Sequence, residues 1–267
     1  MDEDSTLQLH TGRMMPVIGL GTWQLTHDTA EIVAYALEQG FPLIDTSSDY
    51  GTQPGIGEGL KKSKLVRESI YIETKVEETD DAYERTKSNL KELDIAYADL
   101  MLIHRPPLTG AGEELWEGLI KAKKEGLIKD IGVSNYSTNL IDQLIEASGE
   151  VPTVNQIEWS PFGYSEAMLK YCKDKKIIIQ AYSPLTRTKR LDDMTLRQVA
   201  EKYHKTPAQI LIRWNLQLGI CPLPKANQRE HINENIDVFD FELSDKDMLV
   251  LKELNEQYSS LGGLPYI

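Results

Sequence analysis

The chain has 267 residues, of which 40% are hydrophobic and 27% charged, as in ordinary globular proteins and unlike disordered or fibrous ones. Its formal net charge of −13 excludes broad nucleic-acid binding, which needs a basic surface. An acidic N-terminus and the lack of any apolar run near the ~20 residues of a membrane span predict a cytoplasmic protein with no membrane partner.

The first predicted element is a hairpin, in which residues 7–9 and 15–17 flank Thr11-Gly12-Arg13. From residue 17 to about residue 235, short apolar runs alternate eight times with segments of helical period. The predicted strands are 17–20, 43–44, 70–74, 100–103, 131–133, 153–156, 177–181 and 220–223. Strict alternation indicates a parallel sheet, and eight units favour a closed (β/α)₈ barrel over an open doubly wound sheet. We expect the hairpin to cover the barrel floor and residues 1–267 to form one domain.

Several helix ends are marked in the sequence. Asp28 with Glu31 fits a capping box, and Thr206-Pro207-Ala208-Gln209 predicts a helix over 208–218. Ser244 fits the cap of a C-terminal helix that reaches about residue 255. The glycines of Gly55-Ile-Gly57-Glu-Gly59 lack the spacing of a dinucleotide fingerprint and do not follow a strand, so we interpret them as a loop that enters a helix.

Neither cysteine belongs to a metal-ligand or redox motif. Cys172 and Cys221 each adjoin an apolar segment, without a CxxC or Cys/His cluster nearby. The sequence therefore predicts reduced core thiols and no metal site.

Polar residues follow each predicted strand. In chain order they are Gly21-Thr22-Trp23, Asp45, Lys75, His104, Ser134-Asn135, Gln156, Tyr182-Ser183 and Lys225, with Tyr50 five residues beyond Asp45. Taken alone, a lysine or histidine at such a place is more often solvated or hydrogen-bonded than catalytic. Catalytic residues of these barrels lie at the carboxyl ends of the strands, so the convergence on one rim predicts an active site.

These segments resemble the aldo-keto reductase superfamily over nearly the whole chain. The resemblance rests on GLGTW at 19–23, IDTSSDYG at 44–51, TKV at 74–76, LIHRP at 102–106, GVSNY at 132–136, NQ at 155–156, AYSPL at 181–185, PK at 224–225 and EN at 234–235. It implies reduction of aldehydes and ketones with a nicotinamide cofactor, and the reverse oxidation of alcohols.

The resemblance implies that Tyr50 donates a proton to the carbonyl oxygen. A free tyrosine has a pKa near 10, and Lys75 paired with Asp45 would favour the phenolate. His104 would hydrogen-bond the substrate oxygen. The implied substrate contacts are Trp23, His104 and Arg105. Arg105 either admits a polar or acidic substrate or pairs with a nearby carboxylate, and both readings stay open.

The resemblance also implies a cofactor site. Its residues are Gly21, Thr22, Ser134, Asn135, Gln156, Tyr182, Ser183, Leu185, Lys225, His231, Glu234 and Asn235. NADP-preferring relatives hold the 2′-phosphate with a lysine, a hydroxyl residue and an arginine, where this chain has Lys225, Ala226 and His231. A neutral histidine binds anions more weakly than arginine, but Lys225, with Asn227 or Arg229, could still hold the phosphate. We therefore expect NADP(H), with NAD(H) as the alternative.

The segment after residue 260 is short, which predicts an open pocket of broad tolerance that Asp49 and Tyr266 help to line. We expect a small carbonyl compound as substrate and a monomer in solution. Two alternatives stay open, a nucleotide-binding regulatory subunit with little turnover and a lyase or isomerase that uses Lys75 as a Schiff-base amine. The intact set of Asp45, Tyr50, Lys75 and His104 argues against the first.

Overall fold

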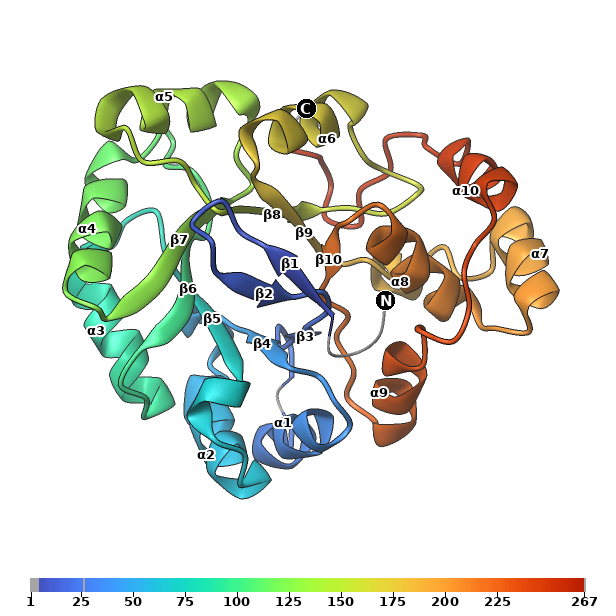
Figure 1. The fold of residues 1–267 in the computed structure, drawn as a ribbon, viewed down its shortest axis with the longest axis horizontal. Helices are drawn as coiled ribbons and strands as arrows, with labels where there is room; N and C mark the ends of the chain where they lie inside the picture. The colour runs from blue at the N-terminus through green and yellow to red at the C-terminus, as the bar shows by residue number, and fades with distance from the viewer. Residues whose placement is uncertain (1–4, 26, 267) are drawn as a thin grey trace.

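The structure is a computed structural model that describes residues 5–25 and 27–266. Eight parallel strands form one sheet in the order β10-β9-β8-β7-β6-β5-β4-β3, and the helices surround it (Figure 1). The strands are β3 (Leu20–Gly21), β4 (Leu43–Asp45), β5 (Tyr71–Val76), β6 (Ala98–Ile103), β7 (Ile128–Ser134), β8 (Val154–Glu158), β9 (Ile178–Tyr182) and β10 (Cys221–Pro222). The predicted (β/α)₈ barrel is confirmed.

The first and last strands close the barrel through their flanking backbone. The Gly19 N–H donates to the Pro222 carbonyl and the Gly21 N–H donates to the Pro224 carbonyl, both at 3.1 Å. A Cβ at Gly21 would lie 2.9 Å from the Leu223 carbonyl oxygen, which is shorter than real contacts. Glycine therefore lets the two strands approach at the seam. The sequence placed this strand at 17–20, but the regular pairing begins only at Leu20.

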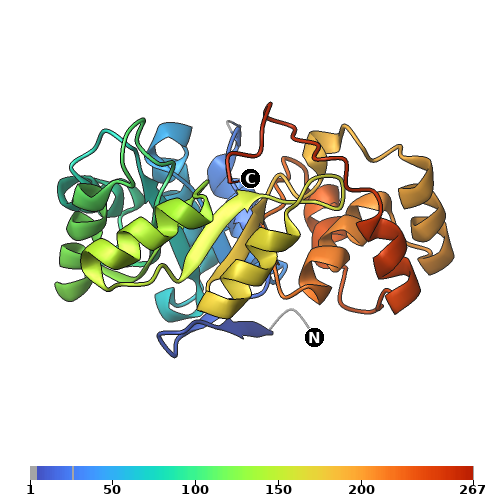
Figure 2. The same cartoon turned by 90° about the horizontal axis from the view of Figure 1, so that it is seen from above.

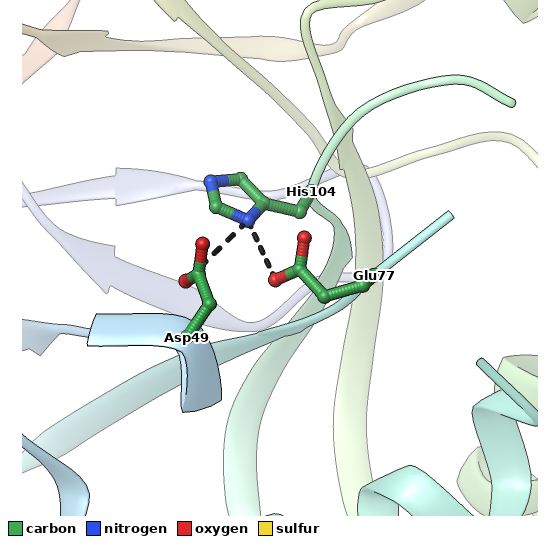
Figure 3. Close-up of side chains that lie close together, drawn as sticks. All are labelled: Asp49, Glu77 and His104. Carbon is green, nitrogen blue, oxygen red and sulfur yellow. Dashed lines mark hydrogen bonds and ion pairs between the residues drawn. The ribbon is translucent and has the colours of Figure 1, made fainter. Parts of the chain in front are cut away.

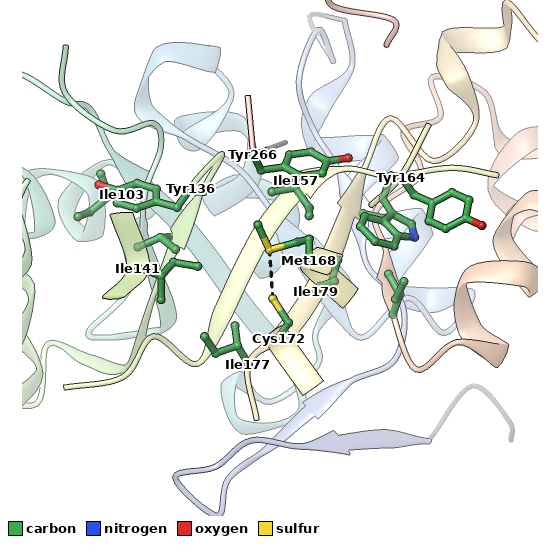
Figure 4. Close-up of a cluster of buried hydrophobic side chains, with 14 of the residues drawn as sticks. Ile103, Tyr136, Ile141, Ile157, Tyr164, Met168, Cys172, Ile177, Ile179 and Tyr266 are labelled. Carbon is green, nitrogen blue, oxygen red and sulfur yellow. Dashed lines mark hydrogen bonds between the residues drawn. The ribbon is translucent and has the colours of Figure 1, made fainter. Parts of the chain in front are cut away.

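The helices form the outer layer and bury their apolar faces against the strands. They are α1 (Thr29–Glu38), α2 (Gln53–Ser63), α3 (Ala82–Leu93), α4 (Glu113–Lys124), α5 (Thr138–Ser148), α6 (Glu166–Lys175), α7 (Met194–Tyr203), α8 (Pro207–Gln217), α9 (Arg229–Ile236) and α10 (Asp245–Lys252). Figure 4 shows the core on one side of the barrel, where Ile157 and Ile179 of the strands meet Ile141 and Met168 of the helices. Within the described part of the chain, no helix is both long enough and apolar enough to cross a membrane.

The two ends of the barrel are covered differently. The hairpin of β1 (Thr6–Gln8) and β2 (Met14–Pro16) lies across one end, as expected, and the C-terminal segment crosses the opposite end (Figure 2). Leu9 and Met15 of the hairpin region pack against buried strand residues such as Leu100 and Cys221. The interior near the hairpin is therefore apolar, and the other end is left for polar chemistry.

The structure confirms one of the two predicted capping boxes and contradicts the other. Thr206 and Gln209 form both bonds of the capping box that begins α8. Asp28 instead has a left-handed backbone (φ 54°) and makes no side-chain cap, so the box predicted at α1 is wrong. Helix α10 stops at Lys252, before the predicted residue 255, and both cysteines are buried free thiols as expected.

The glycines at 55–59 lie inside α2 and not in a loop, so that interpretation is wrong. A Cβ at Gly57 would meet the Leu93 carbonyl oxygen at 2.5 Å, and one at Gly59 would meet the Ala30 carbonyl oxygen at 2.9 Å. Because these glycines have no side chain, α2 can pack closely against α1 and α3.

Candidate active site

A cleft of about 1300 Å³ opens at the end of the barrel opposite the hairpin. Its walls include most residues that the sequence singled out, namely Gly21, Trp23, Asp45, Asp49, Tyr50, His104, Arg105, Ser134, Asn135, Gln156, Tyr182, Ser183, Leu185, Lys225 and His231. The volume exceeds that of a usual drug-sized site, which leaves room for a cofactor together with a substrate.

Lys75 lies behind Tyr50 and has no exposed surface. Its Nζ forms an ion pair with the Asp45 carboxylate, donates to the Thr46 carbonyl at 2.8 Å, and stands 5.0 Å from the centroid of the Tyr50 ring. Burial by itself would lower the pKa of Lys75, but the charge of Asp45, and those of Tyr50 and Glu73 when they ionise, outweigh it and raise the pKa above the ordinary value. Lys75 is therefore a permanent buried cation beside the phenol.

Tyr50 does not acquire the acidity that the sequence reasoning expected. Burial raises its pKa to about 12, and the lowering effect of Lys75 is partly offset by Asp45 and Asp49. The phenol accordingly keeps its proton at neutral pH. A tyrosine held in this state suits proton donation and not the phenolate form.

A buried polar layer beneath this pair was missed by the sequence analysis. The Glu73 carboxylate has no exposed surface and accepts from Gln156 Nε2 at 3.0 Å and Gln180 Nε2 at 2.6 Å. Gln156 Nε2 also donates to Asp45 Oδ1 at 3.0 Å, which joins the layer to the ion pair. Burial and then the charge of Asp45 raise the pKa of Glu73 well above its ordinary value. An acidic residue within a predicted buried strand, directly after Ile72, was the signal that could have revealed it.

We expect Glu73→Gln to stabilise the protein at neutral pH. Because the folded chain raises the pKa of Glu73, its stabilising effect is complete below the ordinary value of 4.5 and is lost as pH rises toward the folded pKa. Glutamine copies the protonated carboxyl and does not ionise when the chain unfolds. Thermal melts from about pH 5 to pH 8 should show the variant gaining several degrees over wild type as pH rises, since 1 kcal/mol moves Tm by about 2–4 °C in a domain of this size. If the difference in Tm between variant and wild type did not change with pH, this prediction would be wrong.

His104 lies on the other side of Tyr50, with ring centroids 5.7 Å apart in an edge-to-face arrangement. Its Nδ1 is 2.7 Å from Glu77 Oε1 and 3.8 Å from Asp49 Oδ1, as Figure 3 shows. Arg105 pairs with three carboxylates, at 3.2 Å to Glu77, 3.2 Å to Glu78 and 3.6 Å to Asp49. Of the two roles left open for Arg105, these contacts favour pairing with nearby carboxylates over binding an acidic substrate.

The ligand atoms of Asp49, Glu77 and His104 lie within 4.8 Å of one another, as in some metal sites. The guanidinium of Arg105 already supplies positive charge to both carboxylates. The cluster is therefore held together by its own charges and does not require a cation.

The far wall of the cleft is built on β7, β8 and β9. Tyr182 Oη donates to Asn135 Oδ1 at 2.8 Å, and Asn135 Nδ2 donates to the His104 carbonyl at 3.1 Å. Ser134 Oγ donates to the Gln156 carbonyl at 2.8 Å. Asn135 and Ser183 both have left-handed backbones, with φ of 64° and 48°, which is uncommon outside glycine and concentrates at functional sites.

Positive charge gathers at the other end of the cleft, after β9 and β10. Arg187 lies over the Trp23 ring at 4.7 Å, within the short helix η3 (Thr186–Thr188), whose three residues all have positive φ. Lys225 has no ion pair with any residue that the structure describes. Partial burial and then the charge of Arg187 lower the pKa of Lys225. Neither cation pairs with a carboxylate among the described residues, so the two make this end of the cleft a candidate site for an anion.

Three predicted cofactor residues do not line the cleft. Thr22 is buried and its hydroxyl donates to the Asp45 carbonyl at 2.8 Å, so it braces the strand end. Glu234 accepts from Thr206 Oγ1 at 2.5 Å, which ties α9 to the start of α8, and Asn235 is 2% exposed. All three support the cleft from behind in this structure. Helix α9, which carries His231, is the eighth helical segment that the alternation predicts before about residue 235.

The C-terminal segment forms part of the cleft wall. Residues 261–265 line it, and Glu158 at the end of β8 holds the segment by accepting from Ser259 Oγ at 2.6 Å and from the Ser260 N–H at 2.7 Å. Tyr266 is 3% exposed and stacks on Trp159 with ring centroids 6.3 Å apart, so it anchors the segment and does not line the pocket. Glu158 was also missed by the sequence analysis.

Comparison with known proteins agrees with this architecture. The model of the aldo/keto reductase family matches residues 17–256. The chain is 38% identical over 257 residues to a glyoxal reductase of Bacillus subtilis (strain 168), covering 94% of this chain and 93% of that protein. It is also 38% identical over 255 residues to a methylglyoxal reductase of Escherichia coli (strain K12), covering 93% and 92%. Among solved structures, a Bombyx mori aldo-keto reductase in complex with NADP is similar, with a TM-score of 0.91 and 30% sequence identity. The match covers 96% of this chain and 94% of that one.

Proposed function

This chain belongs to the aldo/keto reductase family, and from that premise we propose that it reduces aldehydes and ketones with NADPH, with Tyr50 as the proton donor. The observation that carries the proposal is the placement of Tyr50 at the cleft wall, close both to Lys75 of the buried Lys75–Asp45 pair and to His104. Relatives whose names state an activity include reductases of glyoxal and methylglyoxal, both small dicarbonyl compounds.

Tyr50 fits the donor role because its phenol stays protonated until far above neutral pH. As negative charge develops on a carbonyl oxygen, the phenol proton can move to it, and the resulting phenolate would be stabilised by the adjacent Lys75 ammonium. Asp45 and the Thr46 carbonyl fix that ammonium in place, so the charge is set before reaction. The neighbouring cation thus acts after proton transfer and not by ionising the phenol beforehand.

The residues present fit a nicotinamide dinucleotide. Arg187 and Lys225 would hold phosphate groups, since an anion would offset the burial and the charge of Arg187 that together lower the pKa of Lys225. Asn135, Gln156 and Tyr182 would hold and cover the nicotinamide ring. Gln156 directs its amide nitrogen inward to Asp45 and Glu73, which leaves its carbonyl oxygen for the carboxamide. The bound cofactor supplies the hydride.

NADP(H) is the proposed form, supported by Lys225 and by the NADP-bound relative. His231 lines the cleft and is exposed, where an arginine would bind a 2′-phosphate more strongly. We therefore expect the protein to prefer NADP(H) over NAD(H) only moderately.

The function is tested by carbonyl-dependent loss of NADPH absorbance. With methylglyoxal as substrate we expect turnover with NADPH, and about a tenfold lower kcat/KM with NADH, as for loss of one charged contact worth roughly 1.5 kcal/mol. Cofactor binding is followed separately by quenching of tryptophan fluorescence. Binding without turnover on any aldehyde or ketone would reject this function and support a regulatory subunit.

A further inference from the structure

Four buried polar side chains meet across the interior of the barrel, just below the cleft. Asp45 of β4 and Glu73 of β5 are partners in the sheet on one side, and Gln156 of β8 and Gln180 of β9 are partners on the other. Bonds of 2.6–3.1 Å join the two sides. We call these four residues the carboxyl–amide layer. Only Asp45 and Gln156 line the cleft, so Glu73 and Gln180 can act on a ligand only through them.

The layer fixes which end of the Gln156 amide is turned inward. Asp45 is paired with the Lys75 ammonium, and its carboxylate can only accept hydrogen bonds. Asp45 Oδ1 and Glu73 Oε1 each lie 3.0 Å from the same atom of Gln156, which is therefore the NH2 nitrogen. The Gln156 side-chain oxygen bonds to no residue that the structure describes. Because Gln156 lines the cleft, this oxygen is the atom that the cleft presents to a ligand.

Glu73 controls the direction of both glutamine amides. Its Oε2 accepts from Gln180 Nε2 at 2.6 Å, which turns the Gln180 oxygen toward Gln156 Nε2 at 3.1 Å. Its Oε1 accepts from Gln156 Nε2 directly. Asp45 alone would hold Gln156 less firmly, since it takes one of the two amide hydrogens and also accepts from Lys75. A carboxyl can accept on both oxygens with or without its proton, so this arrangement does not depend on the ionisation of Glu73.

We propose that Glu73 is a positioning residue that holds the Gln156 amide, directly and through Gln180, so that the cleft presents an acceptor and selects cofactors with an NH2 donor on the ring. The cofactor part rests on the proposed function, in which Gln156 meets the nicotinamide carboxamide. A ring that carries a ketone in place of the carboxamide has no donor for the Gln156 oxygen. If the Gln156 amide were free to turn over, its NH2 group would serve the ketone as well.

The selection is tested with NADP⁺ and its 3-acetylpyridine analogue, in which a methyl group replaces the carboxamide NH2. Binding is followed by quenching of tryptophan fluorescence, since Trp23 lines the cleft, and requires no turnover. Wild type should bind NADP⁺ about two- to tenfold more tightly than the analogue, as for one hydrogen bond, and Glu73→Leu should bring the two dissociation constants together. Equal affinities in wild type, or an unchanged ratio in Glu73→Leu, would overturn the proposal. Failure of wild type to bind either dinucleotide would instead reject the proposed cofactor.

Asp130→Asn is the matched control for loss of a buried carboxyl. Asp130 has no exposed surface and lies on β7, but it pairs with Arg13 near the hairpin and does not line the cleft. Its replacement should lower stability and leave the ratio of the two dissociation constants as in wild type. A change of that ratio similar to the one in Glu73→Leu would assign the effect to general loosening of the barrel and overturn the role of Glu73.

Glu73→Gln separates positioning from support of the fold. Glutamine puts one acceptor and one donor where the carboxyl has two acceptors, so it cannot hold both amides of the layer as before. This variant is expected to be more stable than wild type at neutral pH and yet to distinguish the two dinucleotides less well. A residue that only supported the fold would not give this combination, and a wild-type ratio in Glu73→Gln would contradict control through both oxygens.

The amide orientation is measured without a cofactor by hydrogen exchange of the Gln156 NH2 group in ¹H–¹⁵N spectra. Its pair of signals is the one missing from the spectrum of Gln156→Leu. The group should be protected in wild type and exchange about tenfold faster in Glu73→Leu, as for loss of one hydrogen bond. Exchange in wild type as fast as that of exposed glutamines would overturn the proposal, whether or not the protein binds a dinucleotide. This measurement and Glu73→Gln also serve if the leucine variant does not fold.

Discussion

Replacing Tyr50 by phenylalanine is expected to lower kcat about 10²–10⁴-fold, the usual contribution of a positioned proton donor. The ring stays in its edge-to-face contact with His104 and over Lys75, so only the hydroxyl is lost. Cofactor affinity, measured by fluorescence quenching, should change little, and kcat/KM should fall in parallel with kcat.

Tyr136→Phe is the matched control for that change. Tyr136 is buried and does not line the cleft, and its hydroxyl donates to the Ala111 carbonyl at 2.9 Å. Its loss should cost about 1 kcal/mol of stability and leave turnover intact. A Tyr50→Phe protein with a kcat within a fewfold of wild type would remove Tyr50 from the mechanism.

Replacing Lys75 by methionine is the second change with a large expected effect. Asp45 is only 4% exposed, and the substitution leaves its carboxylate without the cation that pairs with it. Removing one partner of a buried ion pair lowers the free energy of unfolding by about 3–5 kcal/mol. Thermal unfolding should therefore shift down by about 6–20 °C. Turnover should also fall, because the phenolate formed from Tyr50 would lose its stabilising cation.

The double variant Lys75→Met/Asp45→Asn separates these two effects. Asparagine removes the unpaired charge and keeps the shape of the side chain, so much of the lost stability should return. Activity should not return, since no cation then stands beside Tyr50. Recovery of turnover together with stability would show that the pair serves the fold alone.

The fold and the main site residues could be predicted because their signals are local or repeated. The eight strand–helix units are visible as alternating periodicity, and the rim residues follow the strands directly, as Asp45 and His104 do. Side chains whose role depends on a partner far along the chain could not be placed. Glu73 meets Gln180 across the barrel, and Glu158 meets Ser259 after about one hundred residues.

By itself, therefore, the sequence determined the barrel, the rim and the identity of the groups that meet there, because apolar periodicity and strand ends are properties of neighbouring residues. Only the tertiary structure decided how those groups behave. Burial raises the pKa of Tyr50 so that it keeps its proton, Lys225 and Arg187 come together without an ion-pair partner among the described residues, and a carboxylate from the loop after β5 bonds one ring nitrogen of His104. Charge and proton placement depend on distances of a few ångströms between distant segments, which no pattern along the chain records.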